Sequence, residues 1–346
     1  MNNLLTISIP TYNRDKLFYK CLLSIKKSIE NLPYEDQKLI SIFISDNSDN
    51  DNTKFVVNSI LFEDLNIIYL KNDENIGSDQ NISNCYTVPE SNYVMILGDD
   101  DFLEINSLKN ILVYLKTDKY DLLFLKVYGL TNLNDGRRVE KSFNDISFIN
   151  VKEVLFHRNI HLAFISSTIF KKANIISQEI SNAVGTSLVQ LHFVFLLLSR
   201  SAKAIFINSN LVSVTRNNTG GYDPFNIFIT NYFSALEKYG NLSLTRIELY
   251  DLKIKILNTF YVRSFSQYLK KCKLPINKTQ LNLLDENFNT YFLYKYIYRN
   301  CFLNLSTFNF FILTIFYIFF NIIYYPTKVF DFLYHIKNIM KRTLNN

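Results

Sequence analysis

Three adjacent carboxylates, Asp99-Asp100-Asp101, are the residues of this chain best placed to do chemistry. They follow an apolar run at residues 93–97, which predicts a buried strand that ends at the cluster. Adjacent carboxylates repel one another, and a hard cation that also binds phosphate oxygens would remove the repulsion. The cluster therefore predicts a Mg²⁺ or Mn²⁺ site beside a phosphate-bearing ligand, with a solvated acidic turn as the alternative.

Further polar motifs stand at the ends of other predicted strands. They are Pro10-Thr11-Tyr12-Asn13-Arg14, Asp46-Asn47-Ser48, and Asn75-Ile76-Gly77 followed by Asn81. Each motif taken alone could be ordinary turn or helix-cap chemistry. In open α/β sheets, however, ligands bind at the carboxyl edge of the strands, so we expect all of these motifs to contribute to one site.

The elements that must position these residues follow from the hydrophobic pattern. Short apolar runs alternate with polar stretches of helical period, which predicts an α/β fold with a mainly parallel sheet and flanking helices. Strands are expected at residues 4–9, 40–45, 66–70, 93–97, 122–128 and 204–207, and helices at residues 15–29, 77–86 and 108–115.

With its motifs in this order, the chain resembles family 2 of the inverting nucleotide-sugar glycosyltransferases, whose fold is called GT-A. The matching segments are residues 9–14, 44–48, 75–77 and 97–101. A fainter similarity to bacterial transferases that build surface polysaccharides continues through Gly185-Thr186-Ser187 and residues 217–222.

The resemblance implies roles for individual residues. Thr11, Tyr12 and Arg14 would line the nucleoside pocket, the turn at Pro10 would let this loop approach the ring, and Asp46 would hydrogen-bond the base. Asn75, Gly77 and Asn81 would shape the wall beside the nucleotide. The metal would be held by Asp99 together with Asp101, or chiefly by Asp100, with Asp99 also beside the nucleotide.

An inverting transfer needs a base that takes the proton of the acceptor hydroxyl. Relatives often use a Glu-Asp pair, and this chain has Gln190-Leu191-His192 at the nearest candidate position. His192 is therefore our first candidate and Glu179, the only acid between residues 161 and 215, is the second. His192 stands in the apolar run 188–198 and could equally be a core histidine.

Charge and apolar character change toward the C-terminus. Residues 251–346 carry 13 Lys or Arg and 4 Asp or Glu, a balance of +9, whereas residues 1–250 have −3. The run at 308–325 is strongly apolar but near the shortest length for a span, which needs about 20 residues. Basic residues flank it on both sides, which favours a monotopic or re-entrant helix at an anionic membrane over a nucleic-acid site; a core helix is the alternative.

These patterns predict a GT-A domain at residues 1–215, a helical basic extension at 216–300 and a membrane-associating tail at 301–346. Arg216 begins a glycine-bearing stretch that could close over the diphosphate, or that could be a plain surface connection. Four widely spaced cysteines and no recognisable leader fit a cytoplasmic location, peripheral on the inner face of the membrane.

We therefore expect an enzyme that moves a sugar from a nucleotide-diphosphate sugar to a lipid-linked or polysaccharide acceptor in surface polysaccharide biosynthesis. An inactive nucleotide-sugar-binding or scaffold subunit is the alternative, because the acid pair is missing. A nucleotidyltransferase is disfavoured by the lack of a glycine-rich, lysine-bearing loop near the N-terminus.

Overall fold

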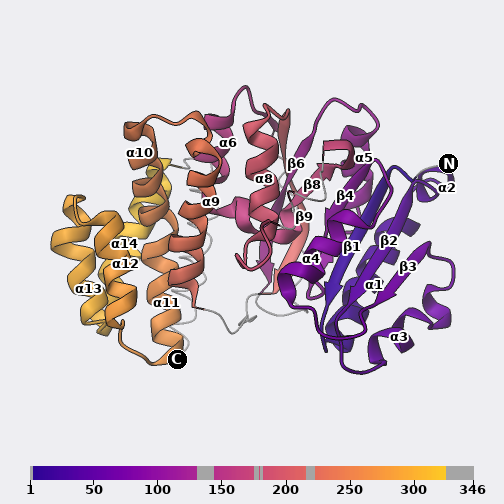
Figure 1. Ribbon diagram of the computed structural model, residues 1–346, viewed down its shortest axis with the longest axis horizontal. Coiled ribbons are helices and arrows are strands. Elements are labelled where there is room, and N and C mark those ends of the chain that lie inside the picture. Colours follow the sequence, from indigo (N-terminus) through magenta and orange to yellow (C-terminus); the bar gives the residue numbers. More distant parts are fainter. Residues whose placement is uncertain (1–2, 131–143, 175–178, 180–181, 216–222, 325–346) are drawn as a thin grey trace, which may run out of the picture. The chain divides into compact units, whose positions relative to one another are not determined.

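The computed structural model describes residues 3–130, 144–174, 179, 182–215 and 223–324. The chain divides into two compact units (Figure 1). The N-terminal unit comprises Met1–Tyr222 and Asn231–Leu242, and the C-terminal unit comprises Asp223–Thr230 and Ser243–Asn346.

A single mixed sheet forms the centre of the N-terminal unit. Its strand order is β3-β2-β1-β4-β8-β6-β9-β5, and β7 pairs with β9. The strands are β1 (Leu5–Thr11), β2 (Ile40–Asp46), β3 (Ile67–Lys71), β4 (Tyr93–Ile96), β5 (Asp101–Leu103), β6 (Leu122–Leu130), β7 (Ile146–Ser147), β8 (Thr168–Lys171) and β9 (Ala204–Thr215).

Four of these strands, β3, β2, β1 and β4, lie side by side and parallel (Figure 1). Their register pairs Thr11 with Asp46, and Asp46 with Lys71. The last residues of three strands therefore stand in one row at the carboxyl edge. Beyond β4 the sheet changes direction, because β8 runs antiparallel to both β4 and β6.

Helices α1 (Asp15–Glu30) and α5 (Ser107–Leu115) pack on this sheet because their apolar residues recur every three to four positions. Phe18, Leu22 and Ile25 of α1 share one core with Leu5, Ile7 and Ile9 of β1. A second aromatic cluster joins Tyr86 of α4 (Ser78–Thr87), Phe170 of β8 and Phe193 of α8 (Val189–Ser199). The other α-helices that the structure describes in this unit are α2 (Tyr34–Gln37), α3 (Asn52–Val57), α6 (Val151–Arg158) and α9 (Tyr232–Lys238).

The C-terminal unit is helical. It contains α10 (Arg246–Ile256), α11 (Val262–Cys272), α12 (Lys278–Phe288), α13 (Arg299–Leu303) and α14 (Thr307–Tyr324), with π-helical turns at Leu257–Tyr261 and Tyr294–Tyr298. The α/β fold class and the helical C-terminal region expected from the sequence are both confirmed. The ends of the predicted strands and helices lie within about two residues of the observed ends, apart from β9, which continues for eight residues beyond the predicted strand.

Candidate functional site

The site is built where β1 and β4 end side by side. Thr11 Oγ1 donates a hydrogen bond to Asp99 Oδ2 at 2.8 Å, and Arg14 Nη1 donates to Asp99 Oδ1 at 3.1 Å. The same Nη1 atom lies 3.5 Å from Asp100 Oδ2. The sheet therefore brings three of the predicted residues into direct contact and places two carboxylates around one positive charge.

Burial of Asp99 has an electrostatic consequence. Removal from water raises the pKa of its carboxyl to about 6, since burial outweighs the nearby Arg14 and the hydrogen bond from Thr11, which both lower it, and Asp100 raises it further. The ionised form of such a buried carboxylate is stabilised when a second positive charge approaches. The pair Asp99 and Asp100 is therefore suited to a cation or to a ligand that brings one.

Asp101 points elsewhere. Ser166 Oγ donates to Asp101 Oδ2 at 2.5 Å, and the backbone N–H of Gly98 donates to Ser166 Oγ at 2.8 Å. A Cβ atom at Gly98 would lie 3.1 Å from Asp101 Oδ2, so a larger residue here would push the Asp101 carboxylate by a few tenths of an ångström. Ser166 is absent from the residues predicted from sequence, and it anchors the third carboxylate to the turn before it.

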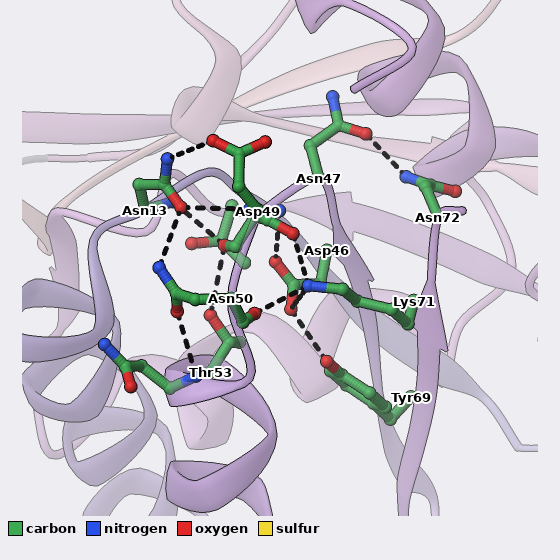
Figure 2. Close-up of polar contacts among 12 residues, drawn as sticks. Asn13, Asp46, Asn47, Asp49, Asn50, Thr53, Tyr69, Lys71 and Asn72 are labelled. Atoms are coloured by element: carbon green, nitrogen blue, oxygen red, sulfur yellow. Dashed lines mark hydrogen bonds and ion pairs between the residues drawn. The ribbon is translucent and has the colours of Figure 1, made fainter. Parts of the chain in front are cut away.

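Asp46 lies fully buried at the end of β2 (Figure 2). Its Oδ1 accepts from the Ser48 N–H at 2.8 Å, its Oδ2 accepts from Tyr69 Oη at 2.7 Å, and Lys71 Nζ lies 3.6 Å away. Burial and the neighbouring Asp46 raise the pKa of the Tyr69 phenol well above its usual value. Tyr69 and Lys71, both from β3, thus fix the carboxylate that the sequence assigned to base recognition.

Two loops meet above Asp46. Asn13 Nδ2 donates to Asp49 Oδ2 at 2.9 Å, and Asn13 Oδ1 accepts from the Asp49 N–H at 3.1 Å (Figure 2). Tyr12 Oη also donates to Asp49 Oδ2, yet the Tyr12 side chain is 44% exposed. The loop after β1 is therefore held rigidly while Tyr12 keeps an accessible ring face, which suits stacking against a planar ligand.

Asn81 of α4 connects the strand ends to one another. Its Nδ2 donates to the carbonyl oxygens of Ser45 at 3.1 Å and Thr11 at 3.4 Å. Its Oδ1 accepts from Ser45 Oγ at 2.6 Å and from Asn72 Nδ2 at 3.1 Å. Asn81 is buried, so its contribution to the site is to fix the relative positions of β1 and β2.

Asn75 and Gly77 belong to the loop before α4. Asn75 Oδ1 accepts from Asn47 Nδ2 at 3.1 Å and from the Gly77 N–H at 3.0 Å. Gly77 has φ = +82°, a backbone conformation that residues other than glycine rarely adopt. The loop is thus tied to the residue that follows Asp46, and the Asn75 and Gly77 predicted from sequence lie in one network with Asp46, Thr11 and Asp99.

Asp79, in the first turn of α4, was not predicted. Its Oδ2 accepts from the backbone N–H groups of Gly185 and Ser187, both at 2.8 Å. Gly185 and Ser187 have positive φ values of +93° and +57°. Successive N–H groups in such turns form a concave anion site, and here the Asp79 carboxylate fills it. The segment before α8 is thereby attached to the first turn of α4, which follows the loop that contacts Asn47.

The two candidate bases have other partners. His192 is buried, its ring lies 5.9 Å from that of Tyr239, the residue that follows α9, and burial together with Lys238 lowers its pKa to about 4. Glu179 accepts from Arg200 Nη2 at 2.6 Å. Neither has a contact with the Asp99 network in the described ranges, and residue 190 of α8 instead donates to the Ala163 carbonyl. Arg216 lies outside the described residues.

The fit of these residues to a metal ion depends on Asp99 and Asp100. Within the parts of the chain that the structure describes, there is no group of three or more His, Cys, Asp or Glu side chains arranged to hold an ion. Mg²⁺ and Mn²⁺ can be held by one or two carboxylates when substrate phosphates supply the other oxygens. The two carboxylates that already face Arg14 satisfy that smaller requirement.

Comparison with known proteins places this site in a family context. Residues 6–173 match the model described as Glycosyl transferase family 2. An uncharacterized glycosyltransferase of Methanocaldococcus jannaschii is 25% identical over 176 residues, which are 49% of this chain and 58% of that protein. The GalNAc(5)-diNAcBac-PP-undecaprenol beta-1,3-glucosyltransferase of Campylobacter jejuni is 31% identical over 109 residues, which are 31% of this chain and 33% of that protein. The chain thus spans less than two thirds of either relative.

Solved structures share the fold over more of the chain. S. aureus TarS 1-349, crystallised with UDP-GlcNAc, superposes with a TM-score of 0.57 at 17% identity, covering 84% of this chain and 81% of that one. The mannosyltransferase PcManGT of Pyrobaculum calidifontis, in complex with GDP-Man and Mn²⁺, gives a TM-score of 0.51 at 14% identity, covering 92% and 88%. The expected GT-A fold is confirmed.

Proposed function

Because residues 6–173 form a Glycosyl transferase family 2 domain, we propose that this protein transfers a sugar, with inversion, from a nucleoside-diphosphate sugar to a lipid-linked or polysaccharide acceptor. The observation that carries the proposal is the contact of Thr11 and Arg14 with Asp99 at the carboxyl edge of the sheet. Ligands of open α/β folds bind at this edge. The sugar class and the acceptor are part of the proposal.

The donor would be recognised at two ends. The ring face of Tyr12 and the carboxylate of Asp46 would take the nucleoside, with Asp46 held in place by Tyr69. Arg14 would carry positive charge to the diphosphate and stabilise it as a leaving group. A divalent ion held by Asp99 and Asp100 would neutralise further phosphate charge.

The names of similar proteins support a lipid-linked acceptor. The Campylobacter relative is named for an acceptor that carries undecaprenyl diphosphate, and the two solved structures bind UDP-GlcNAc and GDP-Man. We propose that this chain uses a donor of the same chemical class and an acceptor at the cytoplasmic face of a membrane. Surface polysaccharide assembly is the process that such a reaction would serve.

The base remains a prediction. In an inverting transfer, the acceptor oxygen bonds to the anomeric carbon as the bond to the diphosphate breaks, and the base takes the hydroxyl proton. The lowered pKa of His192 keeps its imidazole neutral at pH 7, but it also makes the imidazole a weaker base than an ordinary histidine. Glu179 remains the second candidate, and its carboxylate is paired with Arg200.

The test is a screen of nucleotide sugars with Mg²⁺ or Mn²⁺, in which release of nucleoside diphosphate is measured with and without lipid acceptors. Asp99→Ala should abolish release, and His192→Ala should abolish transfer but spare donor binding. If the protein binds donors but releases no nucleoside diphosphate, it is the binding or scaffold subunit. The absence of an acid pair near His192 favours that alternative. Release of pyrophosphate would identify a nucleotidyltransferase.

A further inference from the structure

Helix α14 exposes an apolar stripe in the C-terminal unit. The stripe comprises Phe308, Phe311, Ile315, Phe319, Ile322 and Ile323, which are between 40% and 70% exposed. Their spacing of three to four residues puts them on one side of the helix. Within the described ranges, α14 is the one helix long and apolar enough to cross a membrane by length and composition.

The other side of α14 is packed against the bundle. Phe316 contacts Tyr298 at 5.4 Å between ring centroids, Leu313 is fully buried, and Asn321 Nδ2 donates to the Thr259 carbonyl at 3.5 Å. These contacts run along more than two turns of the helix. α14 is therefore attached lengthwise to the bundle, and the stripe is its most exposed side.

Cations line one flank of the same helix. Lys270 lies 4.4 Å above the Phe310 ring and Arg263 lies 4.8 Å above the Tyr317 ring. The side chains of both Arg263 and Lys270 are exposed, and both belong to α11. Residues 243–324 together contain ten Lys or Arg and four Asp or Glu. The stripe is thus bordered by positive charge, which complements anionic lipid headgroups.

The direction of α14 relative to a membrane follows from these contacts. A helix of 18 residues measures about 27 Å, slightly less than the hydrocarbon core of about 30 Å. If α14 crossed the bilayer, Arg263 and Lys270 would be carried into hydrocarbon with it, which is costly. We propose that α14 lies in the plane of an anionic membrane surface, with the stripe in the acyl boundary and the cations at headgroup level.

The inference rests on the C-terminal unit alone and does not depend on the proposed transferase activity. Its first test is cosedimentation of the full chain with vesicles of phosphatidylcholine, alone or with roughly one third phosphatidylglycerol. We expect strong binding only to the anionic vesicles. The double variant Phe311→Asp with Phe319→Asp should bind at least tenfold more weakly to them, and Arg263→Glu with Lys270→Glu should remove the preference for anionic lipid.

Ile60→Asp is the matched control, because Ile60 is exposed but belongs to the N-terminal unit. It should bind vesicles as the wild type does, and the melting temperature of each variant checks folding. Equal binding by folded wild type and stripe variant would overturn the proposal. So would a wild type that binds no vesicle but dimerises through the stripe, as measured by light scattering.

A second test uses the absence of tryptophan from this chain. Phe308→Trp, Ile315→Trp and Phe319→Trp place single fluorophores along the stripe, and lipids brominated at defined acyl positions report their depth. Equal depths for the three variants are expected for a helix in the membrane plane. A steady change of depth from residue 308 to residue 319 would show that α14 crosses the bilayer.

Discussion

Polar side chains are usually exposed and apolar side chains are usually buried, and the two units depart from this rule in opposite ways. In the N-terminal unit, Asp46 and Asp99 are buried and bonded to other polar side chains. In the C-terminal unit, the stripe on α14 leaves large apolar side chains in water. Both arrangements cost stability in isolation. The difference indicates two kinds of missing partner, a charged ligand at the first place and an apolar phase at the second.

The largest effect is expected when the charges of the buried site are removed. Asp99→Asn and Asp100→Asn each delete a carboxylate that faces Arg14. A charged hydrogen-bonding group contributes about 1.5–3 kcal/mol, so donor affinity in Mn²⁺ should fall by roughly 10- to 100-fold. Calorimetry with UDP- and GDP-sugars measures it. With chelator present, the wild type and the variants should bind the donor equally weakly. A wild-type affinity that is the same with and without chelator would contradict the prediction.

Asp46→Asn should act on the nucleoside end of the same site. The amide keeps the size of the carboxylate but loses its charge, so we expect roughly tenfold weaker binding of nucleoside monophosphate. The melting temperature should also fall, because the single amide oxygen can replace only one of the two acceptors now used by Ser48 N–H and Tyr69 Oη. Glu63→Gln changes an exposed carboxylate outside both loops of the site and serves as the control. Loss of stability without loss of nucleotide affinity would reduce Asp46 to a structural role.

Asp79→Asn tests whether buried charge holds the backbone together. One carboxylate oxygen accepts two N–H groups, and replacement by a neutral amide should destabilise the protein by about 1–3 kcal/mol in urea unfolding. Asp73→Asn, in the exposed loop before α4, should change little. If the two variants unfold alike, the contact with Gly185 and Ser187 contributes nothing measurable.

His192→Phe should alter the pH dependence of stability. The pKa of His192 is lowered to about 4 in the folded protein, against 6.5 for an unperturbed imidazole. Between pH 6.5 and about 4 the unfolded chain takes up a proton that the folded protein refuses, so the free energy of unfolding falls as pH falls. The phenylalanine variant should not show this loss, which is about 1–3 kcal/mol between pH 7 and pH 4 once solvent screening is allowed for. Parallel curves for the two proteins would refute the assignment.

The smallest effect is expected at the stripe. Phe319→Asp places a charge on an exposed position, so the free energy of unfolding without lipid should stay within about 0.5 kcal/mol of the wild-type value. Donor affinity should not change, because the residue belongs to the other unit. A large loss of stability would show that the stripe is covered within the protein, and the contrast between the units would fail.

The sequence predicts those strands and helices whose hydrophobic pattern is visible within a short stretch of the chain. The apolar runs and the helical period gave β1 to β4, and parallel strands share a carboxyl edge, so the meeting of Thr11, Arg14 and Asp99 followed. The strands β5, β7 and β8 have three, two and four residues, too few to show a period.

Long-range contacts were beyond the same reasoning. Ser166 reaches Asp101 across 65 positions, and Asp79 reaches Gly185 across 106. An acidic residue in the first turn of a helix is ordinarily explained by its favourable interaction with the helix dipole. That explanation is sufficient for Asp79, so the sequence gives no indication that its carboxylate has a partner in another segment. Only the folded chain shows that its carboxylate fills a turn in another segment.

Asn81 has a consequence for mutational tolerance. Its four hydrogen bonds use two donor positions and one carbonyl oxygen, at a reach set by a single methylene group. Aspartate lacks the donors, leucine lacks every polar atom, and glutamine is longer by one carbon. In a saturation library of α4, position 81 should therefore reject nearly every replacement, while Gln80, bonded to one neighbour in its own helix, accepts many. Position 81 is therefore the position of α4 at which the amino acid is most constrained.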